Sequence, residues 1–148
     1  MKWYFDTSIF GAAAVETHPH NARALAVLDA MESLGNRGYV SGHSLAEVYS
    51  VLTRTPFPQR LRTDWVMQSL ETLIIATMEL VTLTGAEYQK VIRRCAAQGW
   101  TGGRVFDAVH IECAIKSDCD QLYPFNGKDF VALSPPGLAG KVTLPEAP

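Results

Sequence analysis

Three acidic side chains stand in segments that are otherwise apolar. Asp6 closes an aromatic segment, Glu47 interrupts an apolar helical stretch, and Asp107 shares a helix face with apolar neighbours. A buried carboxylate costs several kcal/mol unless a cation or hydrogen bonds compensate it, and three of them together would raise one another's pKa values. Oxygen ligands suit Mg²⁺ or Mn²⁺, with water and substrate phosphate completing the coordination. The acids therefore predict a divalent-metal site.

Each acid also has an ordinary structural explanation. Asp6 precedes Thr7 and Ser8 and would cap the next helix through its side chain. Glu47 would belong to a solvent-exposed stripe that includes nearby serines. Asp107 lies in the first turn of a predicted helix, where the macrodipole favours an acid by about 0.3 to 1 kcal/mol. Position alone leaves both interpretations open for each residue.

A fourth polar cluster follows the last apolar segment of the chain. It reads Asn126-Gly127-Lys128-Asp129, and an Asn-Gly pair by itself is typical of an ordinary turn. Ligands bind where the strands of an open parallel sheet end. If the preceding strand lies beside the first one, Asn126 or Asp129 comes close to Asp6.

The elements that must position these residues alternate along the chain. Apolar segments bounded by turn residues predict strands at 2–6, 38–41, 79–83 and 121–125, with a short one at 141–144. Helical periodicity and capping residues predict helices at 21–34, 44–53, 59–75, 86–98 and 105–116. Strands separated by helices imply βαβ units. We therefore predict an α/β fold, a three-layer α/β/α domain with a short, mainly parallel central sheet.

The composition is that of one globular domain. The chain has 148 residues, 47% of them hydrophobic, and a formal net charge of -2, which argues against binding nucleic acid over the whole surface. We place the domain at 1–133 and a proline-rich tail at 134–148. No apolar run reaches the roughly 20 residues of a membrane span, and no signal peptide or disulfide spacing is present. We expect a cytoplasmic protein with reduced cysteines.

In their order and spacing, these segments resemble the PIN-domain ribonucleases, and among them the VapC-type toxin subunits of bacterial toxin–antitoxin pairs. The matching segments are Tyr4-Phe5-Asp6-Thr7-Ser8, Ser44-Leu45-Ala46-Glu47-Val48, Val51-Leu52-Thr53-Arg54, Phe106-Asp107-Ala108-Val109-His110-Ile111 and 122–130. The chain departs from the family at Pro124, where a threonine usually stands. The departure removes a hydroxyl that could bond a metal-bound acid or water.

The resemblance implies which residues would carry the chemistry. The family's acidic metal site matches Asp6, Glu47 and Asp107, and its fourth catalytic position matches Asn126. Asp129, about one helical turn later, is a second candidate for this fourth position and a candidate substrate-binding residue. The implied activity is that of a Mg²⁺- or Mn²⁺-dependent endoribonuclease toxin. The cation would bind a phosphate oxygen, activate a water and offset the charge of the transition state.

Within that site the resemblance distinguishes several roles. Asp6 and Asp107 would be direct metal ligands, whereas Glu47 would bind a second ion or orient the attacking water. Thr7 or Ser8 would hold substrate phosphate or a water at the metal. We expect one tightly held ion, with any second one recruited by the RNA phosphate.

Single-stranded or loop RNA would be bound by positively charged side chains and by an aromatic ring that stacks on a base. The candidates are Arg54, Arg60, Arg62, Arg104 and Trp100. A solvated arginine face and a tryptophan that caps the core explain the same residues equally well. The resemblance also implies a cognate antitoxin over the active-site groove and a homodimer. The helices at 21–34 and 59–75 are candidate partner surfaces.

Other classes of protein share parts of this pattern. A non-catalytic PIN-like module would bind RNA or protein without metal, but the three acids together argue against it. A structural zinc site would use the histidines and cysteines, but His18 and His20 lack a partner pair at zinc-finger spacing. We interpret His110 as a helix residue with satisfied hydrogen bonds rather than as a metal ligand. The sequence leaves DNA open as an alternative substrate.

Overall fold

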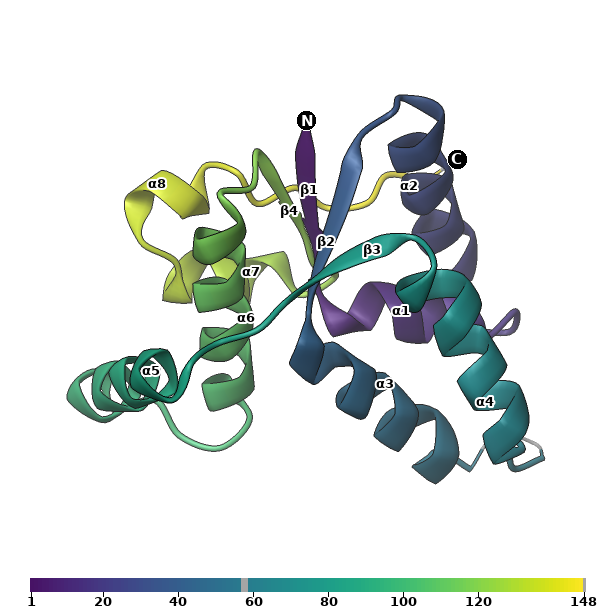
Figure 1. Cartoon of the computed structure of the whole chain (residues 1–148), viewed down its shortest axis with the longest axis horizontal. Helices are drawn as coiled ribbons and strands as arrows, with labels where there is room; N and C mark the ends of the chain where they lie inside the picture. The colour runs from purple at the N-terminus through teal and green to yellow at the C-terminus, as the bar shows by residue number, and fades with distance from the viewer. Residues whose placement is uncertain (57–58, 148) are drawn as a thin grey trace.

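The computed structural model describes residues 1–56 and 59–147. Four parallel strands form one sheet in the order β3-β2-β1-β4 (Figure 1). The strands are β1 (Lys2–Phe5), β2 (Arg37–Ser41), β3 (Met78–Val81) and β4 (Gln121–Tyr123). Their carboxyl ends lie along one edge of the sheet, at the bottom of Figure 1. That edge is where ligands bind in open parallel sheets.

Helices connect the strands and cover both faces of the sheet. They are α1 (Thr7–Ala14), α2 (Asn21–Ser33), α3 (Gly42–Arg54), α4 (Thr63–Leu70), α5 (Gly85–Gln98), α6 (Arg104–Ser117), α7 (Gly127–Leu133) and α8 (Pro136–Ala139), with a π-helical turn, η1 (Glu71–Ile75), after α4. In Figure 1, α1 to α4 lie on one side of the sheet and α5 to α8 on the other. The predicted three-layer α/β/α fold with a parallel sheet is confirmed.

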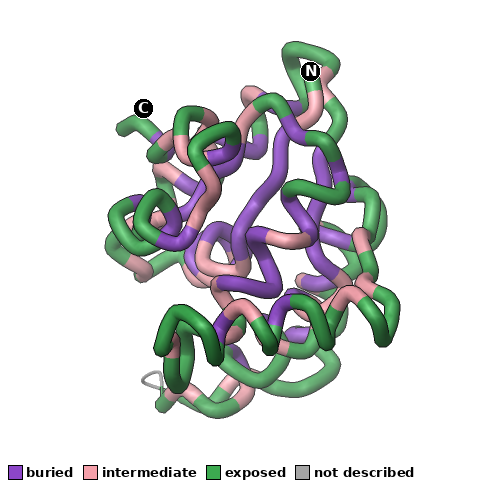
Figure 2. The backbone as a smooth tube through the Cα atoms, turned by 90° about the vertical axis from the view of Figure 1, so that its left-hand side faces the viewer, coloured by how far each residue is buried: buried purple, intermediate pink, exposed green. Residues whose placement is uncertain are grey.

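The sheet separates two apolar cores because successive strand residues point to opposite faces. In β1, Trp3 and Phe5 pack with α1 to α4, whereas Tyr4 packs with the helices of the other side. Phe5 also stacks on Tyr123 of the neighbouring strand, with ring centroids 5.5 Å apart. Figure 2 shows buried strands surrounded by more exposed helical segments. Packing on both faces fixes the strand ends that carry the candidate site.

Two helices that position the site are absent from the sequence prediction. Four residues of α1 are buried, Ile9, Phe10, Ala12 and Ala13, so the segment lacks the polar face that reveals an amphipathic helix. Gly127 begins α7, where the sequence predicts only a turn. Both helices start at the carboxyl end of a strand, α1 after β1 and α7 after β4.

Two further boundaries differ from the sequence prediction. A helix from residue 59 is wrong, because 59–62 are not helical and α4 begins at Thr63. The predicted strand at 141–144 is also wrong, since Val142 makes only an isolated parallel bridge to Leu122.

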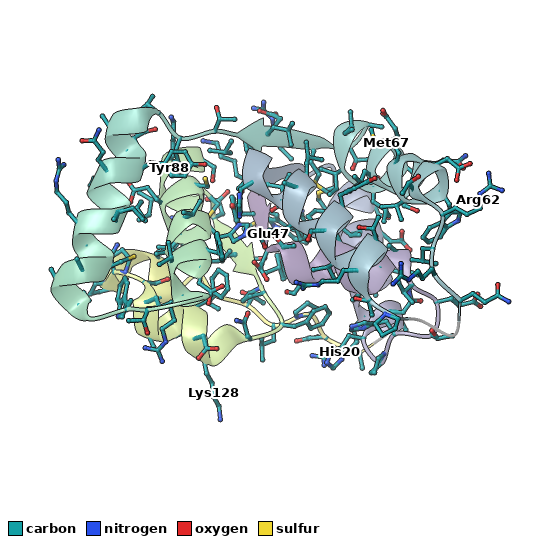
Figure 3. All side chains as sticks on the ribbon, turned by 90° about the horizontal axis from the view of Figure 1, so that it is seen from below. His20, Glu47, Arg62, Met67, Tyr88 and Lys128 are labelled. Carbon is teal, nitrogen blue, oxygen red and sulfur yellow. The ribbon has the colours of Figure 1, made fainter. Side chains whose placement is uncertain are left out.

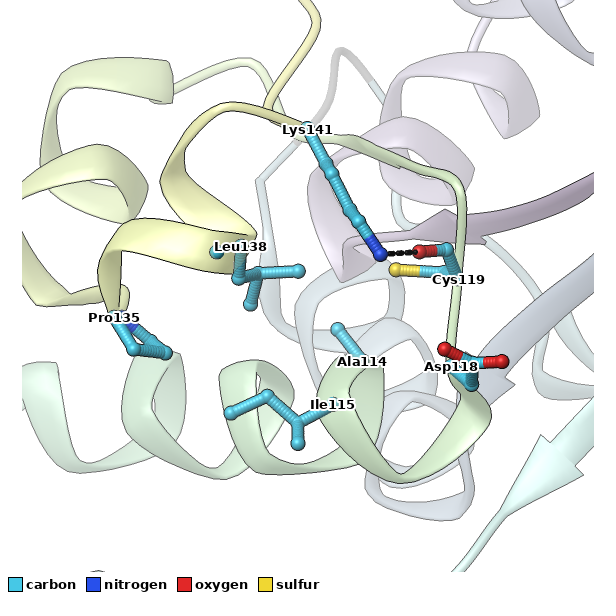
Figure 4. A pocket seen from close by; sticks show the side chains of 8 residues that line it. Ala114, Ile115, Asp118, Cys119, Pro135, Leu138 and Lys141 are labelled. Atoms are coloured by element: carbon cyan, nitrogen blue, oxygen red, sulfur yellow. Dashed lines mark hydrogen bonds between the residues drawn. The ribbon is translucent and has the colours of Figure 1, made fainter.

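The segment after residue 133 packs against the body of the protein. It contains the short helix α8, which the sequence does not predict, and Leu138 in it is buried. Lys141 Nζ donates to the carbonyl of Cys119 at 2.6 Å, beside a hollow of about 310 Å³ that α6 and α8 line (Figure 4). Arg23 Nε donates to the carbonyl of Pro145 at 2.8 Å. The division into 1–133 and 134–148 stays a prediction. None of the described helices has the length and apolar character needed to cross a membrane.

Candidate functional site

The three acids predicted to share a site lie on three elements at the carboxyl edge of the sheet. Asp6 follows β1, Glu47 is in α3 after β2, and Asp107 is in the first turn of α6. The Nε2 atom of His110 lies 3.8 Å from Asp6 Oδ1 and 3.1 Å from Glu47 Oε1. Figure 3 shows Glu47 near the middle of this face. We call Asp6, Glu47 and Asp107 the acidic cluster.

Asp6 is both a helix cap and a member of the acidic cluster. Its Oδ2 accepts hydrogen bonds from the backbone N–H of Ser8 at 3.1 Å and from the Ser8 hydroxyl at 2.6 Å. The other oxygen, Oδ1, lies on the His110 side. The capping role and a place in the site, both left open by the sequence, are therefore compatible. One carboxylate oxygen of Asp6 caps α1, and the other faces the site.

Two histidines lie against Glu47. His110 Nε2 is within hydrogen-bond distance of Glu47 Oε1 at 3.1 Å, and His43 Nε2 lies 2.8 Å from the same oxygen without hydrogen-bond geometry. Burial by itself would raise the pKa of Glu47, but the hydrogen bond and charge of His110 and the charge of His43 bring that pKa below its ordinary value. Glu47 is therefore held as an ionised carboxylate.

His110 ties the acidic cluster to the core. Its side chain is 1% exposed, and its Nδ1 lies 3.2 Å from the Tyr4 hydroxyl. Its Nε2 also lies 3.1 Å from Thr7 Oγ1. Burial lowers the pKa of His110, but the hydrogen bond of Glu47 and the charges of Asp6 and Glu47 raise it above the ordinary value. His110 therefore has the satisfied hydrogen bonds expected from the sequence, but the sequence does not show that Glu47 is one of its partners.

The sequence holds a signal for both histidines. His43 stands four residues before Glu47, and His110 stands three residues after Asp107. Side chains at these spacings lie on the same face of a helix. Each histidine therefore projects toward the side of its helix that carries an acid.

Asp107 is the least compensated acid of the cluster. Burial and the charge of Asp6 raise the pKa of Asp107 to about 6; the charge of His110 opposes this shift, and the charges of Asp129 and Glu47 add to it. Among the described residues, neither lysine nor arginine forms an ion pair with the acidic cluster. A buried acid without a cation beside a second acid is the arrangement expected of a functional site.

Two hydroxyl residues after Asp6 line the site. Thr7 Oγ1 lies 3.0 Å from Ser44 Oγ as well as near His110. Ser8 Oγ accepts the backbone N–H of Phe125 at 3.3 Å. Both hydroxyls therefore already have protein partners at the positions where substrate phosphate or water is predicted.

The end of β4 brings the fourth polar cluster to the same edge. The backbone N–H of Asp6 donates to the carbonyl of Tyr123 at 3.1 Å, so β4 lies beside β1 as expected. Asn126 is the exposed residue that precedes α7. Asp129 is exposed in the first turn of α7, and its charge reaches Asp107.

The residues predicted to bind substrate, two arginines and a tryptophan, are less closely associated with the acidic cluster. Arg104 is exposed at the first residue of α6, three residues before Asp107. Arg62 pairs instead with Asp64 at 2.7 Å. Trp100 packs against the core, and the guanidinium of Arg94 lies 5.3 Å from its ring centroid, which agrees with a tryptophan that caps the core.

The oxygen donors fit a magnesium-type ion held by two carboxylates. No three His, Cys, Asp or Glu side chains in the described part of the chain already surround one point as metal ligands. Mg²⁺ does not need such a cage, because it keeps several waters and binds through one or two carboxylates plus substrate phosphate. The raised pKa of Asp107 beside Asp6 is the effect that two carboxylates have on each other without a cation between them.

Known proteins with the same architecture match along nearly the whole chain. A family model described as the PIN domain matches residues 3–134. The crystal structure of VapC20 from Mycobacterium tuberculosis, a sarcin–ricin loop cleaving toxin, has a TM-score of 0.68 at 14% identity and covers 88% of this chain and 94% of that one. VapBC2 from Rickettsia felis, bound to a DNA fragment from its promoter, has a TM-score of 0.69 at 17% identity and covers 99% and 100%. No curated protein matches the chain.

Proposed function

Since the chain belongs to the PIN-domain family, we propose that it is a metal-dependent endoribonuclease and the toxin of a VapC-type toxin–antitoxin pair. One observation carries the enzymatic part of this proposal. The pKa of Asp107 is raised to about 6 by burial and by Asp6, at the sheet edge where ligands bind. A divalent cation between the two carboxylates would remove their repulsion.

The reaction is hydrolysis of an RNA phosphodiester. Asp6 and Asp107 would hold Mg²⁺ or Mn²⁺, which when bound polarises phosphate and lowers the pKa of water. Ser8 fixes the Asp6 carboxylate through two hydrogen bonds. Glu47, kept ionised by the two histidines, would accept a proton from the attacking water as its oxygen bonds to phosphorus. One P–O bond to a ribose oxygen would break in the same reaction, and that leaving oxygen would take a proton from solvent. Asn126, at the end of β4, would contact the substrate or a metal-bound water.

The partners follow from the same proposal. The substrate class is single-stranded or loop RNA, in keeping with the loop named for VapC20. The fold similarity to VapBC2 supports an antitoxin partner, and we propose that this antitoxin covers the acidic cluster. We also propose a homodimer and a cytoplasmic location.

A second candidate is a PIN-like module that binds RNA or protein without catalysis. The histidines favour this alternative, because His43 and His110 already approach Glu47 and the described residues hold no three-ligand cage. In such a module the histidines would replace the metal permanently.

Calorimetric titration with Mn²⁺, combined with an RNA cleavage assay, separates the two candidates. We expect the wild-type protein to bind Mn²⁺, to cleave a mixture of single-stranded and hairpin RNAs with Mg²⁺ or Mn²⁺, and to stop cleaving with EDTA. Asp6→Asn should bind Mn²⁺ much more weakly yet fold, because asparagine caps helices as well as aspartate. A wild-type protein that releases no binding heat and cleaves no RNA would establish the non-catalytic module.

A further inference from the structure

A cavity of about 370 Å³ lies beside Asp6, and the metal chemistry does not use it. Thr7 and Ser8 form part of its lining, and the Ser8 hydroxyl donates to Asp6 at 2.6 Å. The cavity therefore opens next to the place where a substrate phosphate would bind.

The walls of the cavity are small and aliphatic. They come from two helices, with Gly11 and Ala12 in α1 and Val48, Val51 and Leu52 in α3. Proteins that take an unstacked base out of a nucleic acid hold it between apolar or aromatic side chains of this kind. The walls therefore suit a flat, largely apolar group.

An aromatic and cationic border adjoins these walls. Phe125 lines the cavity, and His20 stacks on it with ring centroids 4.6 Å and planes 19° apart. The guanidinium of Arg23 lies 5.6 Å from the centroid of Phe125. The border combines a ring for stacking with a positive charge that complements an RNA backbone. Figure 3 shows His20 on the same face as Glu47.

Two polar groups of the lining can bond the edge of a base. His18 Nδ1 accepts the backbone N–H of His20 at 3.0 Å, so a neutral His18 carries its proton on Nε2 as a donor. Burial and the charge of His20 lower the pKa of His18 and favour that neutral form. The Thr55 hydroxyl donates to the carbonyl of Val51 at 2.7 Å, and its oxygen can still accept a hydrogen bond.

We propose that this cavity is a nucleobase subsite, which takes one unpaired base of the RNA next to the phosphate at the acidic cluster. The inference rests on the proposed ribonuclease function, because it requires an RNA phosphate at Asp6. An aliphatic side chain from a protein partner would fill the apolar walls but could not use the His18 N–H or the Thr55 oxygen, which belong to partly exposed residues of the lining. A base supplies an edge for both.

Gly11 allows the cavity to be filled without changing the acidic cluster. A Cβ atom at Gly11 would meet no atom within 4 Å, and Gly11 lies inside α1 where leucine is a better helix former than glycine. Gly11→Leu should therefore fold and occupy the cavity, whereas Gly11→Ala should leave most of it open. His18→Phe keeps an aromatic ring and removes the N–H donor.

Short single-stranded RNAs with one abasic nucleotide, moved stepwise along the sequence, test the subsite by fluorescence anisotropy and cleavage. For wild-type protein, one abasic position beside the cleaved bond should weaken binding about tenfold, the effect expected for losing one stacked base. Gly11→Leu should bind intact RNA as weakly as that abasic RNA, with unchanged Mn²⁺ binding. Gly11→Ala, which leaves most of the cavity open, should weaken RNA binding much less than Gly11→Leu. His18→Phe should still bind RNA but should discriminate less among the four bases at that position.

Three outcomes would overturn the inference. If wild-type protein binds no Mn²⁺ and cleaves no RNA, the proposed function fails and the subsite fails with it. If RNA is cleaved but every abasic position is tolerated, the subsite alone is wrong. If Gly11→Leu and His18→Phe both keep wild-type binding and base preference, the cavity serves another occupant, such as a side chain of a protein partner.

Discussion

The two edges of the sheet treat their acidic residues differently. At the amino edge, Asp118 pairs with the Lys2 side chain at 3.5 Å, and Asp120 accepts the Lys2 backbone N–H at 2.7 Å. Glu79 pairs with Arg37 at the start of β2. At the carboxyl edge, no lysine or arginine among the described residues pairs with the acidic cluster; Ser8 caps Asp6, and histidines lie against Asp6 and Glu47.

Under the proposed function, this difference separates acids that serve the fold from acids that would serve a ligand. An exposed acid is easily matched with a lysine, an arginine or a backbone N–H, and the amino edge uses all three. Asp107 is half-buried, and its pKa is raised to about 6. Burying like charges together is unfavourable for folding, so we propose that Asp107 beside Asp6 costs stability in the metal-free protein and is kept for binding.

The largest effect on RNA cleavage should come from replacing an acid at the carboxyl edge, compared with replacing one at the amino edge. Asp107→Asn should lower RNA cleavage by more than about 100-fold, because it removes a direct metal ligand and even residues behind the ligands cost 10–100-fold. Asp118→Asn, at the other end of the same helix, should cleave like wild type. Gel analysis of a labelled RNA and thermal unfolding of both variants provide the measurement. Full activity of Asp107→Asn would reject the assignment of the acidic cluster as the metal site.

Mn²⁺ should stabilise the protein through the carboxyl edge alone. At a concentration 100 times the dissociation constant, the ion should add about 2.7 kcal/mol to the free energy of unfolding. The gain should vanish in Asp6→Asn and persist in Glu79→Gln. Urea unfolding with and without Mn²⁺ measures it. An equal gain in all three proteins would show that the ion binds elsewhere.

The resemblance in the sequence locates the acids, but not how they are held. The motifs around Asp6, Glu47 and Asp107 predict that distant segments share one edge, and the parallel sheet brings them there. His43 and His110 are missed because a histidine on an apolar helix is ordinary, and only the fold shows that both approach Glu47. The spacing of residues within one helix or strand does not show which side chains of another element they will contact.

The fold was predictable where packing gives a periodic pattern. The alternation of strands and amphipathic helices predicts the parallel sheet and its two helical layers correctly. The pattern fails at 7–14, because a helix buried on most sides has no polar face. It also fails at 59–62, where the chain continues toward Thr63 without helical structure.

The histidines at the carboxyl edge should stabilise the metal-free protein as the cations do at the amino edge. His110→Leu would leave the Glu47 carboxylate and the Tyr4 hydroxyl without their buried partner, and should cost about 1–3 kcal/mol of unfolding free energy. His43→Leu should cost less, since the His43 side chain is 30% exposed. Urea unfolding in EDTA measures both. A larger loss in His43→Leu would mean that His110 is not the main partner of Glu47.

The smallest effect should be a pH dependence of Mn²⁺ binding. Because the pKa of Asp107 is raised to about 6, this carboxyl gains a proton as the pH falls through 6. Mn²⁺ must then displace that proton in order to bind. Between pH 7.5 and pH 5.5 the Mn²⁺ affinity should fall about fourfold, whereas an aspartate with an ordinary pKa would lose almost nothing. Calorimetric titration at the two pH values measures the change. The same titration of Asp118→Asn should give the same fourfold loss, because that residue lies at the compensated edge. An affinity that stays constant over this range would show that Asp107 is already ionised without the metal. The acids of the two edges would then differ only in their geometry, not in their pKa values.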